Sequence, residues 1–554
     1  MIQRFWRIGR SLCSVGVLIG TLFFAASLTP SLVPRSFLLQ GVLSGCSFAA
    51  GYAIGVFLRW LWFYMGLPPF SARTERLTTW SAALFGGAVV ASFLWTASEW
   101  QNSIRVPMGL DPVETARPLE VGLIAAAVFF AILMVARLFT LVHATSSRRM
   151  KRFIPPRIAN VLAVLLAGLV FWSVVDGVLF RFGLRAADTS FRQLDALMQS
   201  EFSPPGAAFK TGSAASLIGW DDLGRMGRRF VASGPGAADI AAVSGRAARE
   251  PIRVYVGLNS APTHAARARL ALAELIRVGA FERSVLVLVT PTGTGWIDPA
   301  AMDPLEYLHD GDVASVAVQY SYLTSWLALL IEPGYGADAT RALFTAVYRH
   351  WSDLPQDERP RLYLHGLSLG ALNSDLSVDL FDIVGEPFQG ALWSGPPFST
   401  PTWNAAVADR QPGSPAWLPR FRDGSVMRFT NQQNHLDDGF APWGPLRIVF
   451  LQYASDPVTF FEPTAVYREP AWMRGARAPD VSDALRWTPV VTQLQLALDM
   501  ALATTTPTGF GHVYAHEDYI DAWISLTEPQ GWDGNDIARL KAHFADRPRP
   551  PDAD

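Results

Sequence analysis

Five apolar stretches in the first 185 residues constrain the fold more than any other feature of the sequence. They run from about Ser11 to Leu28, Phe37 to Met65, Leu77 to Ala97, Leu119 to Val142 and Ile158 to Phe180. Each is close to the roughly 20 residues that a membrane-spanning helix needs. The first could also be a cleaved signal peptide, but the four stretches that follow favour a retained anchor. The sequence therefore predicts an α-helical transmembrane bundle of about five spans over residues 1–185.

The basic residues of this region predict its orientation. They gather before the first stretch, around the junction of the second and third, and after the fourth: Arg4, Arg7, Arg10, Arg59, Arg73, Arg76, Arg148, Arg149, Lys151, Arg152 and Arg157. Cytoplasmic loops carry such an excess of Lys and Arg. With five crossings and a cytoplasmic N-terminus, everything after Phe180 should lie outside. Asp176, inside the fifth stretch, could be functional or simply hydrated, and we expect Leu28 to Arg35 to form a plain turn between helices.

The composition excludes several classes of function. Half of the residues are hydrophobic, 17% are charged, and the formal net charge is -2. Nucleic-acid binding needs a concentrated basic face, and none stands out here. The two cysteines, Cys13 and Cys46, both lie in apolar stretches, so the C-terminal part has no disulfide, Cys-based zinc site or catalytic cysteine. We expect no nucleic-acid partner, no metal site and no cofactor.

The composition changes after the apolar region. Residues 186–250 are rich in Gly, Ala, Ser and Pro and are expected to form a linker with amphipathic pieces. Residues 251–545 alternate β-rich runs with helical patterns, which predicts an α/β domain with a mainly parallel sheet; residues 546–554 are expected to be a disordered tail. The expected strands are Ile252 to Gly257, Ser284 to Val289, Ala314 to Gln319, Leu362 to Leu364, Ala391 to Trp393 and Arg447 to Tyr453, with a helix over Ala265 to Val278.

The stretch Arg361 to Ala371 reads as a buried strand that runs into Gly-x-Ser-x-Gly. This pattern is typical of a nucleophile elbow, a strained strand-to-helix turn that lifts a serine above the sheet. Gly366 and Gly370 fit because a side chain at either position would collide in so tight a turn. Ser368 is therefore the candidate nucleophile. The alternative is a strand that ends in an ordinary Gly/Ser turn.

A serine nucleophile needs a base and an acid, which follow it along the chain in the order acid, then histidine. Asp456 directly follows the expected strand Arg447 to Tyr453 and is the candidate acid. His512, in a glycine-flanked loop, is the candidate base, and His516 is the alternative. The other possibilities are weaker: a core role for His365, a frayed tail for His543, and no clear preceding strand for Asp423, Asp437 and Asp438.

The oxyanion hole would combine two backbone N–H groups. The first belongs to Leu369, directly after the candidate nucleophile. The second is assigned to Gly293 or Thr294, in the glycine-rich loop after the strand Ser284 to Val289. A dinucleotide-binding loop is disfavoured there, because Asp298 occupies the last glycine position of that fingerprint.

With these residues in place, the chain resembles the bacterial membrane-anchored α/β-hydrolase family, in which a multi-spanning N-terminal domain precedes a hydrolase domain. The matching stretches are Leu28 to Arg35, Ser216 to Arg229, Ile252 to Ala261, Thr290 to Pro299, Gln319 to Trp326, His365 to Ala371, Trp393 to Phe398, Tyr453 to Pro457 and Gly511 to Tyr514. The resemblance implies a serine hydrolase whose triad is Ser368, Asp456 and His512. It implies no particular substrate.

These observations predict a membrane-anchored serine esterase or lipase of the bacterial inner membrane, with its catalytic domain on the periplasmic side. Anchorage favours a lipid or envelope-bound acyl ester as substrate, and an alcohol acceptor in place of water would make the same site an acyltransferase. The alternative is a non-catalytic scaffold or transport accessory with a degenerate hydrolase domain. The sequence leaves the oligomeric state open.

Overall fold

The structure is a computed structural model that describes residues 12–68, 71–173, 202–322, 334–379 and 383–545. Contacts along the chain divide it into two compact units. The first, here called the helical unit, comprises Met1–Ala186 together with Glu462–Leu502. The second, the sheet unit, comprises Ala187–Phe461 and Ala503–Asp554. The sequence predicted one continuous catalytic domain over 251–545, whereas the segment 462–502 clusters with the N-terminal helices.

The helical unit contains five described N-terminal helices: α2 (Ser14–Ser27), α3 (Phe37–Tyr64), α4 (Ala72–Arg105), α5 (Pro118–Met150) and α6 (Pro156–Trp172). Within the described residues, three helices are long and apolar enough to cross a membrane: Phe37–Tyr64, Thr79–Arg105 and Pro118–Met150. The described residues thus show three of the about five spans that the sequence predicts. Two shorter apolar helices, α2 with 14 described residues and α6 with 17, coincide with the first and fifth expected spans, and the last residues of the fifth, 174–180, lie outside the described part of the chain. Asp176 lies outside the described residues.

Glycines bring the helices of this unit close together. A Cβ at Gly51 would lie 2.7 Å from the Ile19 carbonyl oxygen of α2, and one at Gly55 would lie 2.5 Å from the Cα of Gly16. On another face of α3, a Cβ at Gly45 would lie 2.7 Å from the Ala125 carbonyl oxygen of α5. Small residues of this kind let backbones of membrane helices approach and gain packing contacts where hydrophobic expulsion from water is absent.

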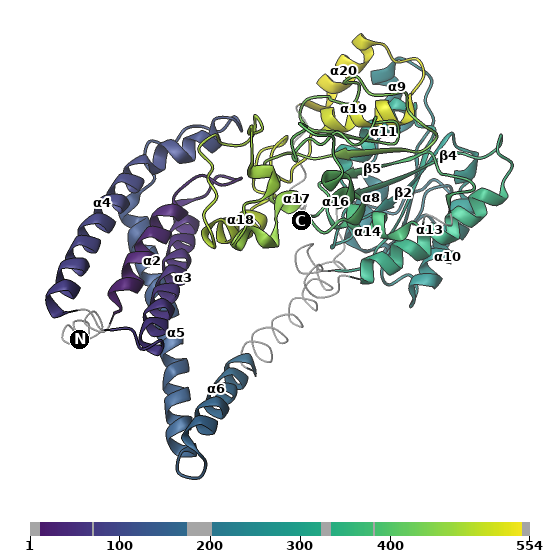
Figure 1. Cartoon of the computed structure of the whole chain (residues 1–554). Helices are drawn as coiled ribbons and strands as arrows, with labels where there is room; N and C mark the ends of the chain where they lie inside the picture. Colours follow the sequence, from purple (N-terminus) through teal and green to yellow (C-terminus); the bar gives the residue numbers. More distant parts are fainter. Residues whose placement is uncertain (1–11, 69–70, 174–201, 323–333, 380–382, 546–554) are drawn as a thin grey trace. The chain divides into compact units, whose positions relative to one another are not determined.

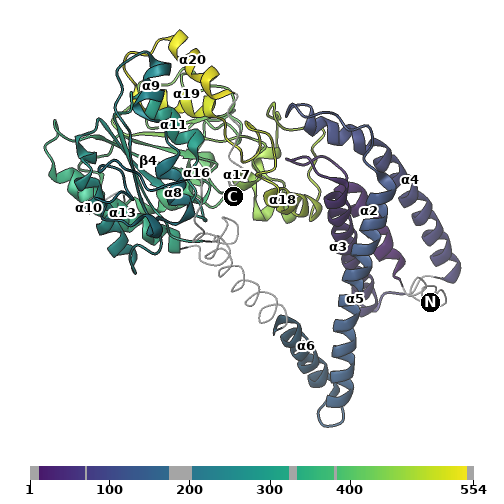
Figure 2. The same ribbon diagram turned by 180° about the vertical axis from the view of Figure 1, so that it is seen from behind.

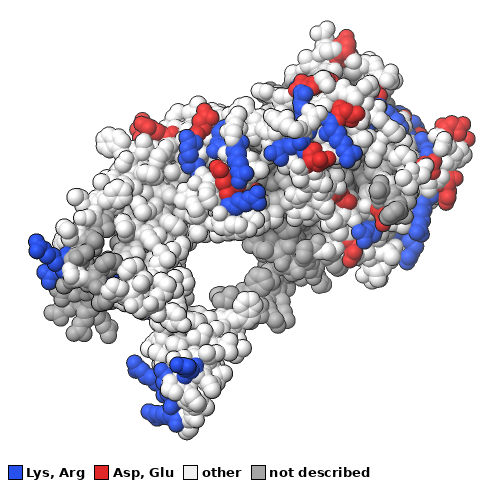
Figure 3. All heavy atoms as spheres, in the orientation of Figure 1, with Lys and Arg blue, Asp and Glu red and all other residues white. Residues whose placement is uncertain are grey.

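The charges of the helical unit lie at the ends of its apolar helices. Figure 3 shows a cluster of Lys and Arg atoms at the turn that joins α5 to α6, whereas the flanks of these helices are largely uncharged. Arg148 and Arg149 end α5, and Lys151 is its C-terminal cap. Such a basic turn beside apolar helices is typical of a cytoplasmic loop.

The segment 462–502 folds into two short 3-10 helices, η4 (Pro463–Val466) and η5 (Ala471–Met473), and helix α18 (Val491–Ala501). Helix α18 packs on α2 and α3. The connector between α2 and α3, Leu28 to Arg35, is a turn between helices, as expected, but it is buried: Leu32 and Val33 are fully buried. This connector therefore forms part of the core of the helical unit.

The described residues of the sheet unit form a sheet of seven strands, all parallel, in the order β1-β3-β2-β4-β5-β7-β6 (Figure 1). The strands are β1 (Ile252–Val256), β2 (Val285–Thr290), β3 (Val313–Val318), β4 (Arg361–Leu367), β5 (Gly390–Ser394), β6 (Met427–Thr430) and β7 (Arg447–Leu451). The predicted mainly parallel sheet is confirmed. The edge strand β6 is the one element of the sheet that the sequence analysis missed.

Helices cover both faces of the sheet. Helices α10 (His264–Arg277), α13 (Tyr335–Asp353) and α14 (Leu369–Ser377) pack side by side, and α11 (Pro299–Leu308) packs against α19 (His516–Thr527) (Figures 1 and 2). Because β1, β2, β3 and β5 are buried at every position, their sequences are mostly apolar rather than alternating. The charged exception is Arg253 in β1, which pairs with Asp303 and Glu306 at 2.7 Å.

The second half of the expected linker is folded. Residues from Trp220 onward form η2 (Trp220–Leu223), α8 (Gly224–Ala232) and α9 (Ala237–Ser244). Helix α8 lies on β1, where a Cβ at Gly227 would lie 2.4 Å from the Tyr255 ring. This segment thus belongs to the sheet unit and covers its first strand.

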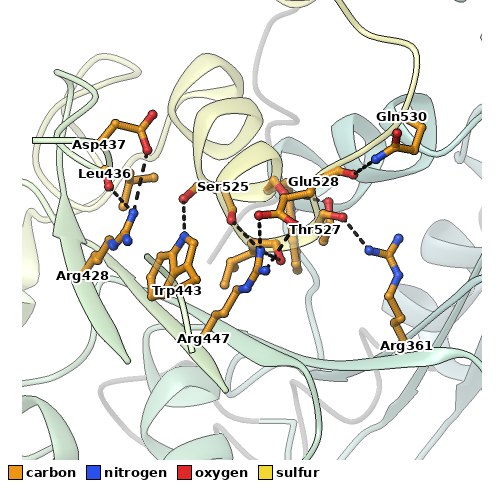
Figure 4. A network of polar contacts seen from close by, with 12 residues as sticks. Arg361, Arg428, Leu436, Asp437, Trp443, Arg447, Ser525, Thr527, Glu528 and Gln530 are labelled. Carbon is orange, nitrogen blue, oxygen red and sulfur yellow. Dashed lines mark hydrogen bonds and ion pairs between the residues drawn. The ribbon is translucent and has the colours of Figure 1, made fainter. Parts of the chain in front are cut away.

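The C-terminal end of α19 is held at the start of two strands. Arg361, which opens β4, donates from Nη1 to the Thr527 carbonyl oxygen at 2.6 Å, and Arg447, which opens β7, pairs with Glu528 at 2.8 Å (Figure 4). After it, Gly534–Ala545 forms α20, so His543 lies in a helix and not in a frayed tail. The expected tail 546–554 lies outside the described residues.

Candidate active site

The strand β4 ends at Leu367, and α14 begins at Leu369. Between them, Ser368 has a φ of 58° and a ψ of -127°, a conformation that residues with a side chain rarely adopt. Steric contacts explain the flanking glycines. A Cβ at Gly366 would lie 2.3 Å from the Gly370 carbonyl carbon, and a Cβ at Gly370 would lie 2.2 Å from the Thr290 carbonyl oxygen. The Gly-x-Ser-x-Gly segment thus has the strained strand-to-helix turn that its pattern indicates.

Asp456 lies just beyond the C-terminal end of β7 and caps the short helix α17 (Pro457–Phe460). Its side chain is fully buried. Oδ1 accepts the Val458 N–H at 2.8 Å, while Oδ2 accepts the Tyr514 hydroxyl at 2.7 Å and the Thr459 hydroxyl at 3.3 Å. These donors fix the direction in which the carboxylate points.

His512 lies beside this carboxylate. Its Nδ1 is 2.7 Å from Asp456 Oδ2, which requires a proton on Nδ1 and leaves Nε2 as the acceptor of a neutral ring. Nε2 is buried and has no hydrogen-bond partner among the described residues. The backbone of the loop is held at two points: the His512 N–H donates to the Ala503 carbonyl oxygen at 2.9 Å, and the Gly511 N–H donates to Ser455 Oγ at 3.0 Å.

The end of β5 links the histidine to the elbow. Ser368 donates its N–H to the Ser394 carbonyl oxygen at 3.0 Å. The next residue, Gly395, faces the His512 ring, and a Cβ there would lie 2.5 Å from Cε1. The structure thus brings Asp456 and His512 into contact and places the ring one residue from the elbow's backbone partner. Within the described residues, no hydrogen bond joins Ser368 Oγ to His512 Nε2.

The candidate oxyanion groups come from two places. Leu369 is the first residue of α14, where the backbone N–H has no acceptor within the helix. Gly293 and Thr294 lie in a tight turn closed by a hydrogen bond from the Thr292 N–H to the Trp296 carbonyl oxygen at 2.9 Å. This turn follows β2, which is the neighbour of β4 in the sheet. It therefore stands at the same edge of the sheet as the elbow.

The alternative histidines have other surroundings. His516 opens α19, and its ring stacks on Phe544 with centroids 4.8 Å apart. His365 is buried and pairs through Nδ1 with the Leu392 carbonyl oxygen at 2.9 Å, and burial lowers its pKa to about 4. His365 is therefore a neutral core residue, as the sequence indicates. His543 packs on Tyr307, with centroids 5.3 Å apart.

The alternative acids lie outside this group. Asp438 pairs with His435 at 2.7 Å, but 47% of its side chain is exposed, and the Asp437 side chain is 89% exposed. Asp423 accepts the Ser425 hydroxyl at 2.7 Å in an exposed turn. Within the described residues, no three His, Cys, Asp or Glu side chains lie close enough together to hold a metal ion.

Sequence reasoning missed the role of Tyr514. Its hydroxyl donates to the same Asp456 oxygen that His512 contacts. Burial, and then the charge of Asp456, raise the pKa of this hydroxyl well above its ordinary value, so it remains a donor. A signal was present, because Tyr514 lies two residues after His512, and alternate residues of an extended segment point to the same side.

A parallel sheet with helices on both faces, and a serine in a strained turn after a central strand, define an α/β-hydrolase. A profile of the alpha/beta-hydrolase family matches residues 252–540, and a profile of that family's N-terminus matches residues 28–235. The chain therefore belongs to the alpha/beta-hydrolase family. Comparison with curated proteins and with solved structures finds no match.

Proposed function

We propose that the protein is a membrane-anchored serine hydrolase that cleaves an acyl ester. The observation that carries this proposal is the contact between Asp456 and His512, in which the buried His512 Nε2, close to the elbow, has no hydrogen-bond partner in the described part of the chain. A buried, unpaired ring nitrogen is costly. A serine hydroxyl or a reacting substrate would satisfy it.

In the proposed reaction, Ser368 Oγ attacks the acyl carbonyl carbon while His512 Nε2 takes its proton. Asp456, held by Tyr514, stabilises the imidazolium that forms. The N–H of Leu369 and one from the turn after β2, at Gly293 or Thr294, would hold the oxyanion. His512 then returns the proton to the alcohol that leaves. Water, activated by the same ring, attacks the acyl-enzyme and releases the acid.

The proposed substrate is a lipid or an envelope-associated ester. Three helices of the helical unit are long and apolar enough to cross a membrane. An enzyme held in a bilayer meets esters of that bilayer at a high effective concentration. We further propose that the membrane is a bacterial inner membrane and that the sheet unit faces the periplasm. The basic turn between α5 and α6 is typical of the cytoplasmic side, and the fifth apolar stretch, Ile158 to Phe180, would cross the membrane once more before the sheet unit.

A fluorophosphonate probe on purified full-length protein tests the nucleophile. We expect labelling of the wild type, no labelling of Ser368→Ala, and a loss of ester hydrolysis of about 10⁴-fold or more in that variant. The histidines form a matched pair: His512→Ala should lose activity to a similar extent, whereas His516→Ala should keep it per folded molecule. Labelling that survives Ser368→Ala would contradict the proposed nucleophile.

A panel of esters with varied acyl chains and headgroups, with and without an alcohol acceptor, tests the substrate class. Hydrolysis of long-chain lipid esters in preference to short soluble esters supports the proposal. A new ester formed from the alcohol would instead identify an acyltransferase. If the correctly folded wild type cleaves no ester of the panel and does not react with the probe, the protein is a non-catalytic scaffold and the proposed hydrolase activity is wrong.

A further inference from the structure

The proposed acid and base flank the segment that folds with the helical unit. The chain leaves the sheet unit after Phe461, five residues beyond Asp456, and returns at Ala503, nine residues before His512. Asp456 and His512, which must stay in contact during the proposed reaction, thus lie on either side of the segment 462–502 along the chain. The contacts that anchor the segment 462–502 can therefore affect the contact between Asp456 and His512 through the connecting backbone.

The segment 462–502 is anchored by a buried polar contact, here called the clasp, between α18 and the connector that joins α2 to α3. In α18, Asp499 Oδ1 accepts the Ser31 hydroxyl at 2.9 Å, and Oδ2 accepts the Leu32 N–H at 2.9 Å. Arg35 lies 4.0 Å away, and both charged side chains are completely buried. Gln495, one turn earlier, donates to the Thr29 carbonyl oxygen at 3.0 Å.

Because the clasp is buried, separating Asp499 from Arg35 is energetically costly. Burial lowers the pKa of Arg35 and raises that of Asp499, and the attraction between the two charges opposes both shifts. Arg35 Nε and Nη1 have no hydrogen-bond partner among the described residues. If Asp499 moved away, Arg35 would be a buried charge with no counter-ion, which is strongly unfavourable. The clasp should therefore hold the end of α18 in one place.

A short path leads from the clasp to the proposed base. Helix α18 ends at Ala501, two residues after Asp499. The carbonyl oxygen of Ala503 then accepts the His512 N–H at 2.9 Å. Thr506, between them, donates its hydroxyl to the Phe510 carbonyl oxygen at 2.6 Å and closes the loop. The backbone of His512 is thus bonded to the first residue that follows the anchored segment.

We propose that Asp499 is a positioning residue for His512, acting through the end of α18 and Ala503. This inference rests on the proposed function, since it concerns the base of that reaction. Asp499 touches no reacting atom. It would restrict the movement of the chain just before Ala503, to which the His512 N–H is hydrogen-bonded, and through this bond the movement of the His512 ring against Asp456. A shift of about 1 Å in such a group can lower the rate about 100-fold.

The chain contains a matched control. Glu274 in α10 is also fully buried and likewise accepts a serine hydroxyl and the next N–H, from Ser216 at 2.7 Å and Leu217 at 3.0 Å. Its arginine, Arg277, is closer than Arg35 is to Asp499 and donates to it at 2.7 Å. The donors Ser216 and Leu217 form a Ser-Leu pair, as do Ser31 and Leu32. Helix α10 carries no residue of the proposed site, so a substitution there reports the general cost of losing a buried carboxylate.

The test compares Asp499→Asn with Glu274→Gln, and the milder Ser31→Ala with Ser216→Ala, all in full-length protein in detergent. Active sites are titrated with the fluorophosphonate to the end point, so that kcat refers to competent molecules only. We expect kcat per titrated site to fall about tenfold in Asp499→Asn and two- to threefold in Ser31→Ala, with KM within about twofold of the wild type. Glu274→Gln and Ser216→Ala should keep the wild-type kcat per site.

The outcomes separate the two proposals. If Asp499→Asn and Ser31→Ala lose titratable sites but keep the wild-type kcat per site, the clasp is merely structural and the positioning role is overturned. If the wild type itself hydrolyses no ester and resists the probe, both proposals fail together. If the wild type is active and the clasp variants have the same kcat per titrated site, only the positioning role is overturned.

Discussion

A single backbone conformation organises the candidate site at the residue scale. Ser368 has a positive φ of 58°, which costs of the order of 1–3 kcal/mol for a residue with a side chain. The surrounding strand and helix maintain it. Two glycines at fixed spacing are required by sterics, so this turn could be predicted from five residues of sequence. The contact of His512 with Asp456 could be predicted only from their order after strands, because no local pattern joins residues so far apart.

A buried carboxyl, Asp518, lies next to the site without belonging to the proposed triad. It accepts a hydrogen bond from the Tyr453 hydroxyl, and that hydroxyl in turn accepts the Ala515 N–H at 2.9 Å. The Tyr453 ring stacks on Tyr514, with centroids 4.4 Å apart. Burial, reinforced by the charges of neighbouring acids, raises the pKa of Asp518 to about 7.

This raised pKa predicts a pH-dependent contribution to stability. Between the ordinary pKa of 3.8 and about 7, the folded state keeps the proton that the unfolded state has lost. The free energy of unfolding should therefore fall as the pH rises through this window. In Asp518→Asn, which cannot ionise, this contribution is absent. We expect the stability of the wild type relative to Asp518→Asn to be greatest near pH 4 and to decline until about pH 7.

Thermal unfolding of both proteins across this pH range measures the effect. The difference between them isolates Asp518, because other buried groups, such as His309 with its pKa lowered to about 3 by burial, titrate in both proteins. Parallel curves for the two proteins would show that Asp518 titrates near its ordinary value in the folded state.

At the scale of elements, the residue that follows β5, Gly395, determines the space that is available to the His512 ring. Gly395 has a φ of 50°, and its N–H donates to the Leu451 carbonyl oxygen at 3.0 Å, which continues the pairing of β5 with β7. The His512 ring lies against its Cα, since a Cβ there would stand 2.5 Å from the ring. Only a residue without a side chain leaves this space for the histidine.

Gly395→Ala should therefore move the His512 ring and lower kcat by about 100-fold, with a smaller effect on KM. Gly439→Ala is the control, because Gly439 also has a positive φ, 69°, but faces open space. It shares the backbone strain without the collision, so its kcat per titrated site should match that of the wild type. Equal values of kcat in the two variants would mean that the ring does not depend on this space.

The elements of the sheet differ in how well the sequence predicts them. The central strands are mostly apolar, and their predicted bounds agree with the structure to within a few residues. The edge strand β6 was missed because it has four residues and a charged one, Arg428, in the middle. This arginine is buried all the same: it donates to the carbonyl oxygens of Gly424, Leu436 and Ala441 at 2.6–2.9 Å. No periodicity reveals such a local network.

For the whole molecule, the division into units follows contacts that the sequence does not reveal. Asp499 and Ser31 are 468 positions apart, and helix α18 has an ordinary amphipathic composition. Predicting that the segment 462–502 folds with the N-terminal helices would require knowing that a buried arginine in the connector needs a carboxylate. Apolar stretches, by contrast, are visible by composition alone, although their number as complete spans is not.

The proposed orientation of the whole molecule can be tested with its cysteines. The chain has two, Cys13 and Cys46, so replacing both by serine gives a background without thiols. Asp357, exposed between α13 and β4, and Arg149, exposed at the end of α5, can then each be changed to cysteine. Because the basic turn after α5 should be cytoplasmic and the sheet unit external, a membrane-impermeant maleimide on intact inner-membrane spheroplasts should label Asp357→Cys. Arg149→Cys should react only after the membrane is permeabilised. The reverse pattern would place the sheet unit, and Ser368 with it, in the cytoplasm, and its substrate would then be an ester of the inner leaflet or a soluble one.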